Sequence, residues 1–170
     1  ASTAHAEMLC SIGIITKEEF EQAKKGLAEV ESEWRAGRFP VTREQEDCHT
    51  AIEQFLTVKY GDMGKKIHTG RSRNDQSLTM LRLYMKSKLK ECRELNASVA
   101  DVFAAASKLH CDVPMPGYTH AQKAMPTSVG KFLDSFTQAF RDADRILKST
   151  QELVNQNPLG SAAGFGINHL

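Results

Sequence analysis

The sequence has no excess of charge of either sign. It holds 22 Lys and Arg residues against 21 Asp and Glu residues. Nucleic-acid-binding domains and proteins that bind anionic membrane surfaces usually carry a basic excess, so the composition gives no support to either class of partner. Any electrostatic attraction for a ligand must then come from a local group of charges. We therefore expect no nucleic acid and no membrane as a partner.

Paired cysteines are also missing. The four cysteines are scattered along the chain, without a C-x-x-C pair and without histidines at the spacing of a zinc site. This pattern is typical of reduced thiols in a cytosolic protein. We therefore expect a cytoplasmic location and no bound metal.

Long apolar segments and targeting signals are absent as well. No apolar run is long enough to cross a bilayer. The first nine residues, ASTAHAEML, lack the basic and apolar regions of a signal peptide. The chain begins with Ala1 instead of Met, so we expect it to be part of a longer protein.

What the sequence does contain is helical periodicity, in a composition that is 41% hydrophobic. Thr16 and Glu19 have the spacing of a capping box and predict the start of an amphipathic helix. Gly37 and Pro40 predict its end. A second helix is predicted within residues 46–61, where Gly61 follows the apolar stripe as a stop signal.

Two much longer helices are predicted further along the chain. Apolar residues recur at steps of three and four from Leu78 to Leu109, which corresponds to a helix of about 50 Å. The same pattern returns from Val129 to Val154. Because no segment requires a β-strand, the predicted fold class is all-α, a bundle of long helices. Two such helices cannot bury their apolar faces against each other alone, so we expect an oligomer.

Residues 68–77 form a run of ten residues without a hydrophobic side chain. They precede the first long helix, so Asn74 or Asp75 can cap it while its free N–H groups face the loop. Arg71 and Arg73 add two guanidinium groups at the same place. This combination predicts a pocket for a carboxylate or phosphate. The alternative is that these residues only cap a helix and solvate a turn.

Three further segments carry polar or small residues. The connection between the long helices, residues 112–128, holds Thr119, His120 and Gln122 together, either as reacting and hydrogen-bonding groups or as a histidine satisfied in a turn. The pair Asp47 and His49 in EDCHT is consistent with a helix cap and a surface histidine. The stretch NPLGSAAGFG is either a flexible segment or a site where the backbone approaches a ligand closely.

Five motifs together resemble argininosuccinate lyase, a family of the fumarase and aspartase superfamily with δ-crystallin relatives. They are, in the family's order, ASTAHAEML, EDCHTAIE, KKIHTGRSRNDQ, MPGYTHAQKAMP and NPLGSAAGFG. HTGRSRNDQ is specific to the family, whereas GYTH.Q is shared across the superfamily. The resemblance implies part of the superfamily's helical fold, with residues 1–67 in an N-terminal helical domain and residues 68–170 forming the first part of a central long-helix domain.

The resemblance also implies an activity, the reversible β-elimination of argininosuccinate to arginine and fumarate in arginine biosynthesis and the urea cycle. It implies no cofactor, and a homotetramer whose active sites are shared between subunits. Thr119 and His120 match catalytic positions. The positions that match substrate contacts are Ser2, Arg73, Asn74, Thr119 and Gln122. The positions that match support of the pocket are Asp47, His49, Arg71, Asp75 and Tyr118.

The sequence departs from the family pattern at Thr3, Ala121, Lys123 and Met125, which flank the matched residues. The family's mobile-loop motif, GSS.MP.K.NP, which carries the serine that acts as catalytic base, does not occur in these 170 residues. We therefore expect the isolated chain to be inactive. Three alternatives stay open: a structural, crystallin-like homologue, another fumarate-releasing lyase such as adenylosuccinate lyase, and a plain helical assembly module.

Overall fold

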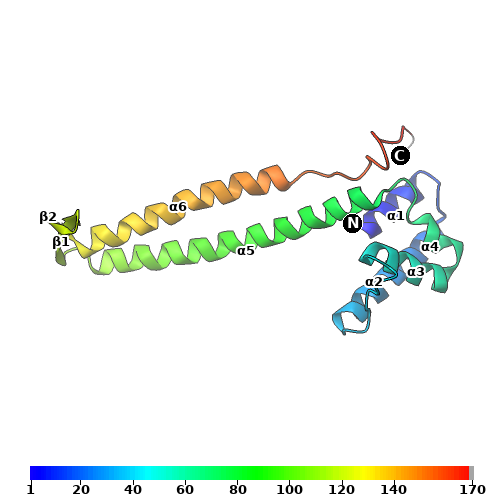
Figure 1. Cartoon of the computed structure of the whole chain (residues 1–170), viewed down its shortest axis with the longest axis horizontal. Helices are drawn as coiled ribbons and strands as arrows, with labels where there is room; N and C mark the ends of the chain where they lie inside the picture. The colour runs from blue at the N-terminus through cyan, green and yellow to red at the C-terminus, as the bar shows by residue number, and fades with distance from the viewer. Residues whose placement is uncertain (169–170) are drawn as a thin grey trace. The chain divides into compact units, whose positions relative to one another are not determined.

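A computed structural model describes residues 1–168 of the chain (Figure 1). Its elements are α1 (Ser2–Ser11), α2 (Lys17–Arg35), α3 (Cys48–Tyr60), α4 (Asp62–Lys66), α5 (Arg73–Leu109), β1 (Pro114–Thr119), β2 (Gln122–Ser128) and α6 (Val129–Val154). They fall into two compact units. Unit 1 comprises Ala1–Leu81 and the segment that begins at Asn157, and unit 2 comprises Arg82–Gln156. The division into domains at residue 67 stays a prediction.

The core of unit 1 is built by the first four helices. Leu9 of α1 and Leu56 of α3 are fully buried in it. The predicted capping box at the start of α2 is confirmed, because the Glu19 backbone N–H donates to Thr16 Oγ1 over 3.1 Å and the Thr16 N–H donates to Glu19 Oε2 over 2.9 Å. These contacts satisfy two N–H groups that the helix itself leaves free.

Helix α3 begins after Asp47, whose carboxylate accepts a hydrogen bond from the Thr50 backbone N–H over 2.9 Å. Its C-cap is Gly61, as predicted, with φ at +61°. Gly64 of α4 then packs against the α3 backbone so closely that an added Cβ would lie 2.2 Å from the Thr57 nitrogen. This close approach holds the segment that follows α4 beside α3.

Helix α5 begins at Arg73, earlier than its predicted apolar seam at Leu78, and runs for 37 residues. Ser72 and Asp75 form a reciprocal cap, in which the Asn74 N–H donates to Ser72 Oγ (3.3 Å) and the Ser72 N–H donates to Asp75 Oδ1 (3.1 Å). Asp75 therefore contributes to the cap as predicted, whereas Asn74 lies within the first turn. Among the described residues, no helix combines the length and apolar character that a bilayer span requires.

In unit 2, α5 and α6 lie side by side (Figure 1). Phe103 of α5 stacks on Phe136 and Phe140 of α6, with ring centroids 5.2 and 5.7 Å apart. The Asn96 side chain donates to the Phe140 carbonyl over 2.8 Å, and the Ser107 hydroxyl donates to the Gly130 carbonyl over 2.8 Å. The prediction of two long helices is thus confirmed.

The predicted helical fold class is confirmed, but the expectation that no segment requires a β-strand is wrong for residues 114–128. Strands β1 and β2 pair in an antiparallel hairpin, with Thr119 opposite Gln122. His120 and Ala121 form its turn, both with positive φ (50° and 60°), which is the pattern of a type I′ turn. Prolines are tolerated here because a two-stranded hairpin consists only of edge strands, where a missing N–H is not needed for pairing.

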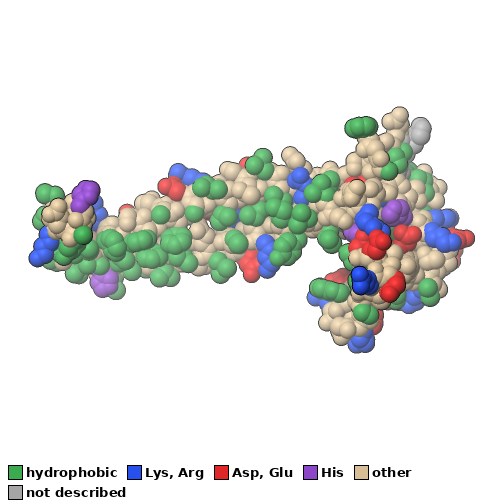
Figure 2. Space-filling view, viewed as in Figure 1, with side chains coloured by type: hydrophobic (Ala, Val, Ile, Leu, Met, Phe, Trp, Pro, Cys, Tyr) green, Lys and Arg blue, Asp and Glu red, His purple; other side chains and the backbone are tan. Residues whose placement is uncertain are grey.

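Unit 2 leaves many large apolar side chains exposed. They line the helix pair in the space-filling view (Figure 2). Leu95 and Val102 on α5 are 62% and 68% exposed, and Ile146 and Leu153 on α6 are 70% and 69% exposed. Within unit 2, α5 and α6 pack against each other as a pair, which leaves part of the apolar surface of each helix uncovered. The expectation of unpartnered apolar surface is confirmed for the described residues.

Candidate functional site

The predicted site residues fall into two sets. One set lies in unit 1, on α1, α3 and the first turn of α5, and consists of Ser2, Asp47, His49, Arg71, Arg73, Asn74 and Asp75. The other set lies in the β1–β2 hairpin of unit 2 and consists of Tyr118, Thr119, His120 and Gln122.

Arg71 is the central buried cation of unit 1. Its side chain is only 9% exposed. Its Nε donates to the Ile67 carbonyl over 3.1 Å, its Nη2 donates to the same oxygen, and its Nη1 donates to Ser2 Oγ over 3.1 Å. Burial lowers the pKa of Arg71, while the negative charges of Asp75 and Glu53 oppose that shift. Arg71 thus joins the loop before α5 to the first residue of α1.

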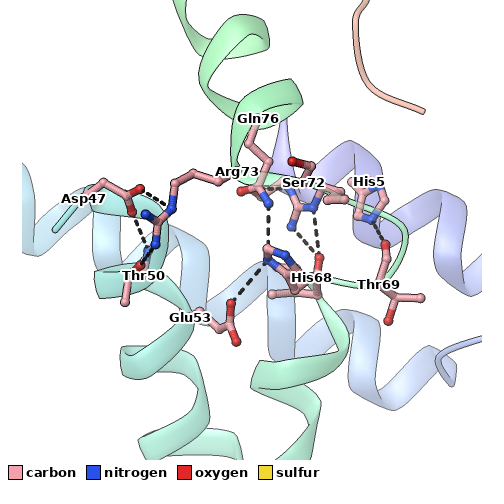
Figure 3. A network of polar contacts seen from close by, with 12 residues as sticks. His5, Asp47, Thr50, Glu53, His68, Thr69, Ser72, Arg73 and Gln76 are labelled. Atoms are coloured by element: carbon pink, nitrogen blue, oxygen red, sulfur yellow. Dashed lines mark hydrogen bonds and ion pairs between the residues drawn. The ribbon is translucent and has the colours of Figure 1, made fainter. Parts of the chain in front are cut away.

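Arg73 contacts the start of α3 and the residue before its cap (Figure 3). Its Nη1 lies 2.6 Å from Glu46 Oε2 and its Nε lies 2.9 Å from Asp47 Oδ2. A third contact runs from Nη2 to Thr50 Oγ1 over 3.4 Å. The hydrogen bond to Glu46 raises the pKa of Arg73. Burial tends to raise the pKa of Asp47, but the Thr50 N–H and the Arg73 charge outweigh it, so that pKa is lowered.

A histidine between two polar partners lies next to these arginines (Figure 3). His68 Nδ1 lies 3.4 Å from Glu53 Oε2 and 3.3 Å from Gln76 Nε2. Nδ1 can donate a proton to Glu53 or accept one from the Gln76 amide, depending on the tautomer of the ring. His5 is held separately, with Nε2 2.9 Å from the Thr69 carbonyl.

These groups line a small pocket of about 20 Å³ that opens to solvent. Its polar lining consists of Ser2, His49, Glu53, His68, Arg71 and Gln76. His49 Nε2 is buried, and no hydrogen-bond partner for it lies among the described residues. Burial lowers the pKa of His49, although the charge of Asp47 works in the opposite direction. His49 therefore favours its neutral form at this pocket.

The charges in unit 1 are more balanced than the run of residues 68–77 predicts. Two guanidinium groups, Arg71 and Arg73, face four carboxylates, from Glu46, Asp47, Glu53 and Asp75. Both arginines already have protein partners. Their role as anion ligands therefore stays a prediction, and a ligand carboxylate at Arg73 would have to compete with a carboxylate of the protein.

Asp75 is buried (3% exposed) and serves two backbone segments. Besides Ser72, it accepts a hydrogen bond from the Ala162 N–H over 3.0 Å, which fixes part of the NPLGSAAGFG stretch to the start of α5. Ala162 has a positive φ of 50°. Asn74, by contrast, is exposed at the first turn of α5.

In the hairpin, Thr119 and Gln122 flank the turn as paired residues, and His120 occupies its first central position. All three side chains are exposed, and Tyr118 is 63% exposed. Non-glycine residues with positive φ store backbone strain and often occur at functional sites. The structure thus brings Thr119, His120 and Gln122 together, as predicted. Within residues 1–168, no group of three or more His, Cys, Asp or Glu side chains is arranged to hold a metal ion.

Sequence reasoning assigned no role to Glu46 or Glu53, and it included His68 and Gln76 only as members of the polar run of residues 68–77. Glu53 follows His49 by four residues on α3, so helical spacing alone places both on one face. Glu46, His68 and Gln76 could not be singled out, because they occur among many polar residues with no periodic pattern.

Comparison with known proteins assigns the chain to a family. The model of a family described as Lyase matches residues 1–169. The chain belongs to this lyase family. It is 45% identical over 168 residues to an argininosuccinate lyase of Stenotrophomonas maltophilia (strain R551-3) and 42% identical to one of Sorangium cellulosum (strain So ce56). Each match covers 99% of this chain and 39% of the relative, so the chain spans about 39% of the length of these relatives.

Solved structures of lyases have the same fold. A variant of EDDS lyase with bound fumarate superimposes with a TM-score of 0.86 at 27% identity, over 98% of this chain and 32% of that protein. A fumarate lyase:delta crystallin from Brucella melitensis superimposes with a TM-score of 0.77 at 14% identity, over 92% of this chain and 39% of that protein, which shows the fold alone. The predicted resemblance to argininosuccinate lyases is confirmed at 42–45% identity over almost the whole chain.

Proposed function

We propose that the protein containing this chain is an argininosuccinate lyase, which converts argininosuccinate reversibly into arginine and fumarate in arginine biosynthesis. The observation that carries the proposal is the 42–45% identity of almost the whole chain to relatives named argininosuccinate lyase. The HTGRSRNDQ motif, specific to that family, supports the same substrate.

The reaction needs a base, a group of hydrogen-bond donors and an acid. The base removes a proton from the carbon beside a succinyl carboxylate, and the electrons of the broken C–H bond form the double bond of fumarate. The C–N bond breaks with its electrons on the guanidinium nitrogen, which receives a proton. The carboxylate next to the carbanion becomes doubly charged, and preorganised donors must stabilise it.

Several residues of this chain suit these roles. Ser2 Oγ accepts a hydrogen bond from Arg71, so its own proton is available to a ligand oxygen. Asn74 is an exposed amide at the start of a helix, where the dipole favours negative charge. We assign substrate contacts also to Arg73, Thr119 and Gln122, and catalysis to Thr119 and His120. The pocket is supported by Asp47, His49, Arg71, Asp75 and Tyr118.

We further propose a homotetramer with shared active sites. The support is the exposed apolar surface of unit 2, including Leu95 and Val102, which is larger than a monomeric helix pair normally leaves in water. The double variant L95E/V102E should reduce the oligomer seen by light scattering, whereas Glu91→Gln, on the same helix, should not. An unchanged mass for L95E/V102E would contradict the assembly through this surface.

A cytoplasmic location belongs to the same proposal. All four cysteines are free thiols, which is the usual state in a reducing compartment.

The experiment that tests the activity uses a chimera, in which this chain replaces the matched 168 residues of the Stenotrophomonas lyase. Fumarate release from argininosuccinate is measured, with adenylosuccinate and EDDS as comparison substrates. His120→Ala should lower the rate by at least about 100-fold if His120 transfers a proton. His110→Ala is the matched control, because His110 is exposed at the end of α5 and lies outside the predicted site.

A second candidate is a fumarate-releasing lyase that acts on a different amine. The fold match to EDDS lyase at a TM-score of 0.86 favours it. Turnover of EDDS or adenylosuccinate but not argininosuccinate by the chimera would establish this alternative. No release from any substrate, by a folded chimera of native mass, would favour a structural, crystallin-like role.

A further inference from the structure

Arg73 is bound by two carboxylates that differ in how firmly the protein holds them. Asp47 contacts the Nε of Arg73 and Glu46 contacts its Nη1, over 2.9 and 2.6 Å. Both carboxylates come from consecutive residues just before α3. Arg73 therefore already has a protein partner on Nε and on Nη1 at the position where the proposed function requires it to contact substrate, although its side chain is still 53% exposed.

Asp47 is fixed in place. It is the N-cap of α3 and accepts a hydrogen bond from the Thr50 N–H, and its side chain is only 26% exposed. Removing it from Arg73 would also remove the helix cap. Asp47 thus holds the Nε side of Arg73 independently of any ligand.

Glu46 is held weakly by comparison. Its side chain is 67% exposed, and its backbone has a φ of +64°, a conformation that is unfavourable for a residue with a Cβ. An ion pair this exposed contributes little to stability, because water screens it and both side chains lose freedom. Exchange of Glu46 for another carboxylate at Arg73 therefore costs little.

We propose that Glu46 is an exchangeable internal carboxylate, which occupies Nη1 of Arg73 and is displaced by a carboxylate of the ligand. The proposal rests on the proposed function in one respect, namely that the ligand is a dicarboxylate such as fumarate. Glu46 then competes with the ligand for Arg73 and lowers the affinity of every ligand that must displace it. A ligand without a carboxylate cannot replace Glu46 at Arg73, whereas a carboxylate ligand exchanges one ion pair for another and leaves the Asp47 contact intact.

The test uses the chimera described above, because the proposed site also draws on segments outside these 170 residues, with fumarate as the probe and fumaramide as its uncharged analogue. The dissociation constant is measured by isothermal titration calorimetry. Glu46→Gln removes the competing charge with little change of shape and should tighten fumarate binding by about fivefold, the upper range for an exposed ion pair. Glu44→Gln removes the same charge from an exposed residue of the same loop and should leave the affinity unchanged.

Two further variants test whether the gain in fumarate affinity depends on Arg73 and on the backbone conformation at residue 46. Arg73→Gln should abolish the gain produced by Glu46→Gln, and Glu46→Gly should bind fumarate at least as well as Glu46→Gln, because glycine tolerates the positive φ. Melting midpoints of all variants establish that they are folded. Fumaramide should bind none of them more tightly than wild type.

The outcomes that overturn the proposal are distinct. Equal fumarate affinity in Glu46→Gln and wild type would overturn it, as would the absence of fumarate binding in both. A gain that persists in the double variant with Arg73→Gln would also overturn it, because the competition would not involve Arg73. Failure of this proposal can be told apart from failure of the proposed activity. If the chimera releases fumarate from argininosuccinate but Glu46→Gln does not change fumarate affinity, the lyase function stands and only the exchange of Glu46 is excluded.

Discussion

Arg93 on α5 donates hydrogen bonds to both carboxylate oxygens of Asp144 on α6, from Nε over 2.9 Å and from Nη2 over 3.1 Å. This two-point contact fixes the orientation of the guanidinium plane as well as its position. Gln151, two turns further along α6, accepts a third hydrogen bond from Arg93 Nη1 over 3.1 Å. One arginine therefore sets the register between the two helices of unit 2.

The Arg93–Asp144 pair should make stability depend on pH. The hydrogen bond from Arg93 lowers the pKa of Asp144 in the folded protein. A lowered folded-state pKa stabilises the protein above the unfolded-state pKa of about 4, and this contribution is lost as the pH falls through the folded value. Asp144→Asn should lower the melting midpoint at pH 7, and the difference from wild type should shrink below about pH 4. Asp142→Asn, an exposed residue paired only within α6, should show a smaller difference at pH 7.

Gly130 allows the start of α6 to approach the end of α5. A Cβ at this position would lie 2.5 Å from the Cys111 Cα and 2.6 Å from the Ser107 carbonyl oxygen, both backbone atoms. Gly130→Ala should therefore lower the free energy of unfolding by about 1–3 kcal/mol, measured in urea. Gly164→Ala is the control, because a Cβ there meets no atom within 4 Å, and its effect should stay within about 0.5 kcal/mol. Equal effects of the two substitutions would contradict the close approach.

Arg71 and Ser2 should be energetically coupled. Arg71→Ala removes the donors to the Ile67 carbonyl and to Ser2 Oγ, and a buried acceptor left without a donor costs about 1–3 kcal/mol. Ser2→Ala alone should cost less, because Ser2 is only partly buried. The double variant should then lose less stability than both single variants predict together. Strict additivity in urea unfolding would show that the Arg71–Ser2 contact contributes nothing.

The capping box of α2 gives the fourth prediction. Thr16→Ala removes the oxygen that accepts from the Glu19 N–H and should destabilise unit 1 by about 1 kcal/mol. Thr16→Ser keeps the hydroxyl and should restore most of the loss. If the serine variant were as unstable as the alanine variant, the hydroxyl would have no capping role.

The helices could be predicted from sequence because their signals are local. Thr16 and Glu19 lie within one turn, and Asp47 and Gly61 bound α3 by their own backbone preferences. The hairpin could not be predicted in this way. Pro116 lies opposite Pro126, and neither has a backbone N–H to donate. The preferences of these residues therefore disfavour β-sheet hydrogen bonding at this point, although the hairpin as a whole forms.

The site could be predicted only in part, for a similar reason. The residue types at Arg71, Arg73 and Asp75 indicate charge and capping, and the structure places these residues at the start of α5. Their partners come from residues distant in sequence: Ser2 lies 69 residues from Arg71, and Glu46 lies 27 residues from Arg73. Composition and spacing cannot show that both guanidinium groups are already paired, because that depends on how α1 and α3 pack.

The two-residue turn at His120 and Ala121 limits which changes the hairpin can accept. Successive residues of a strand point to opposite faces, so a change of turn length that shifts the β1–β2 register by one residue would reverse the facing of Tyr118 and Thr119 relative to β2. A substitution in β2, such as Lys123 or Met125 in place of the family's usual residues, leaves that alternation unchanged. The length of this segment is therefore under tighter constraint than its composition, and related chains should vary here by replacement and not by insertion.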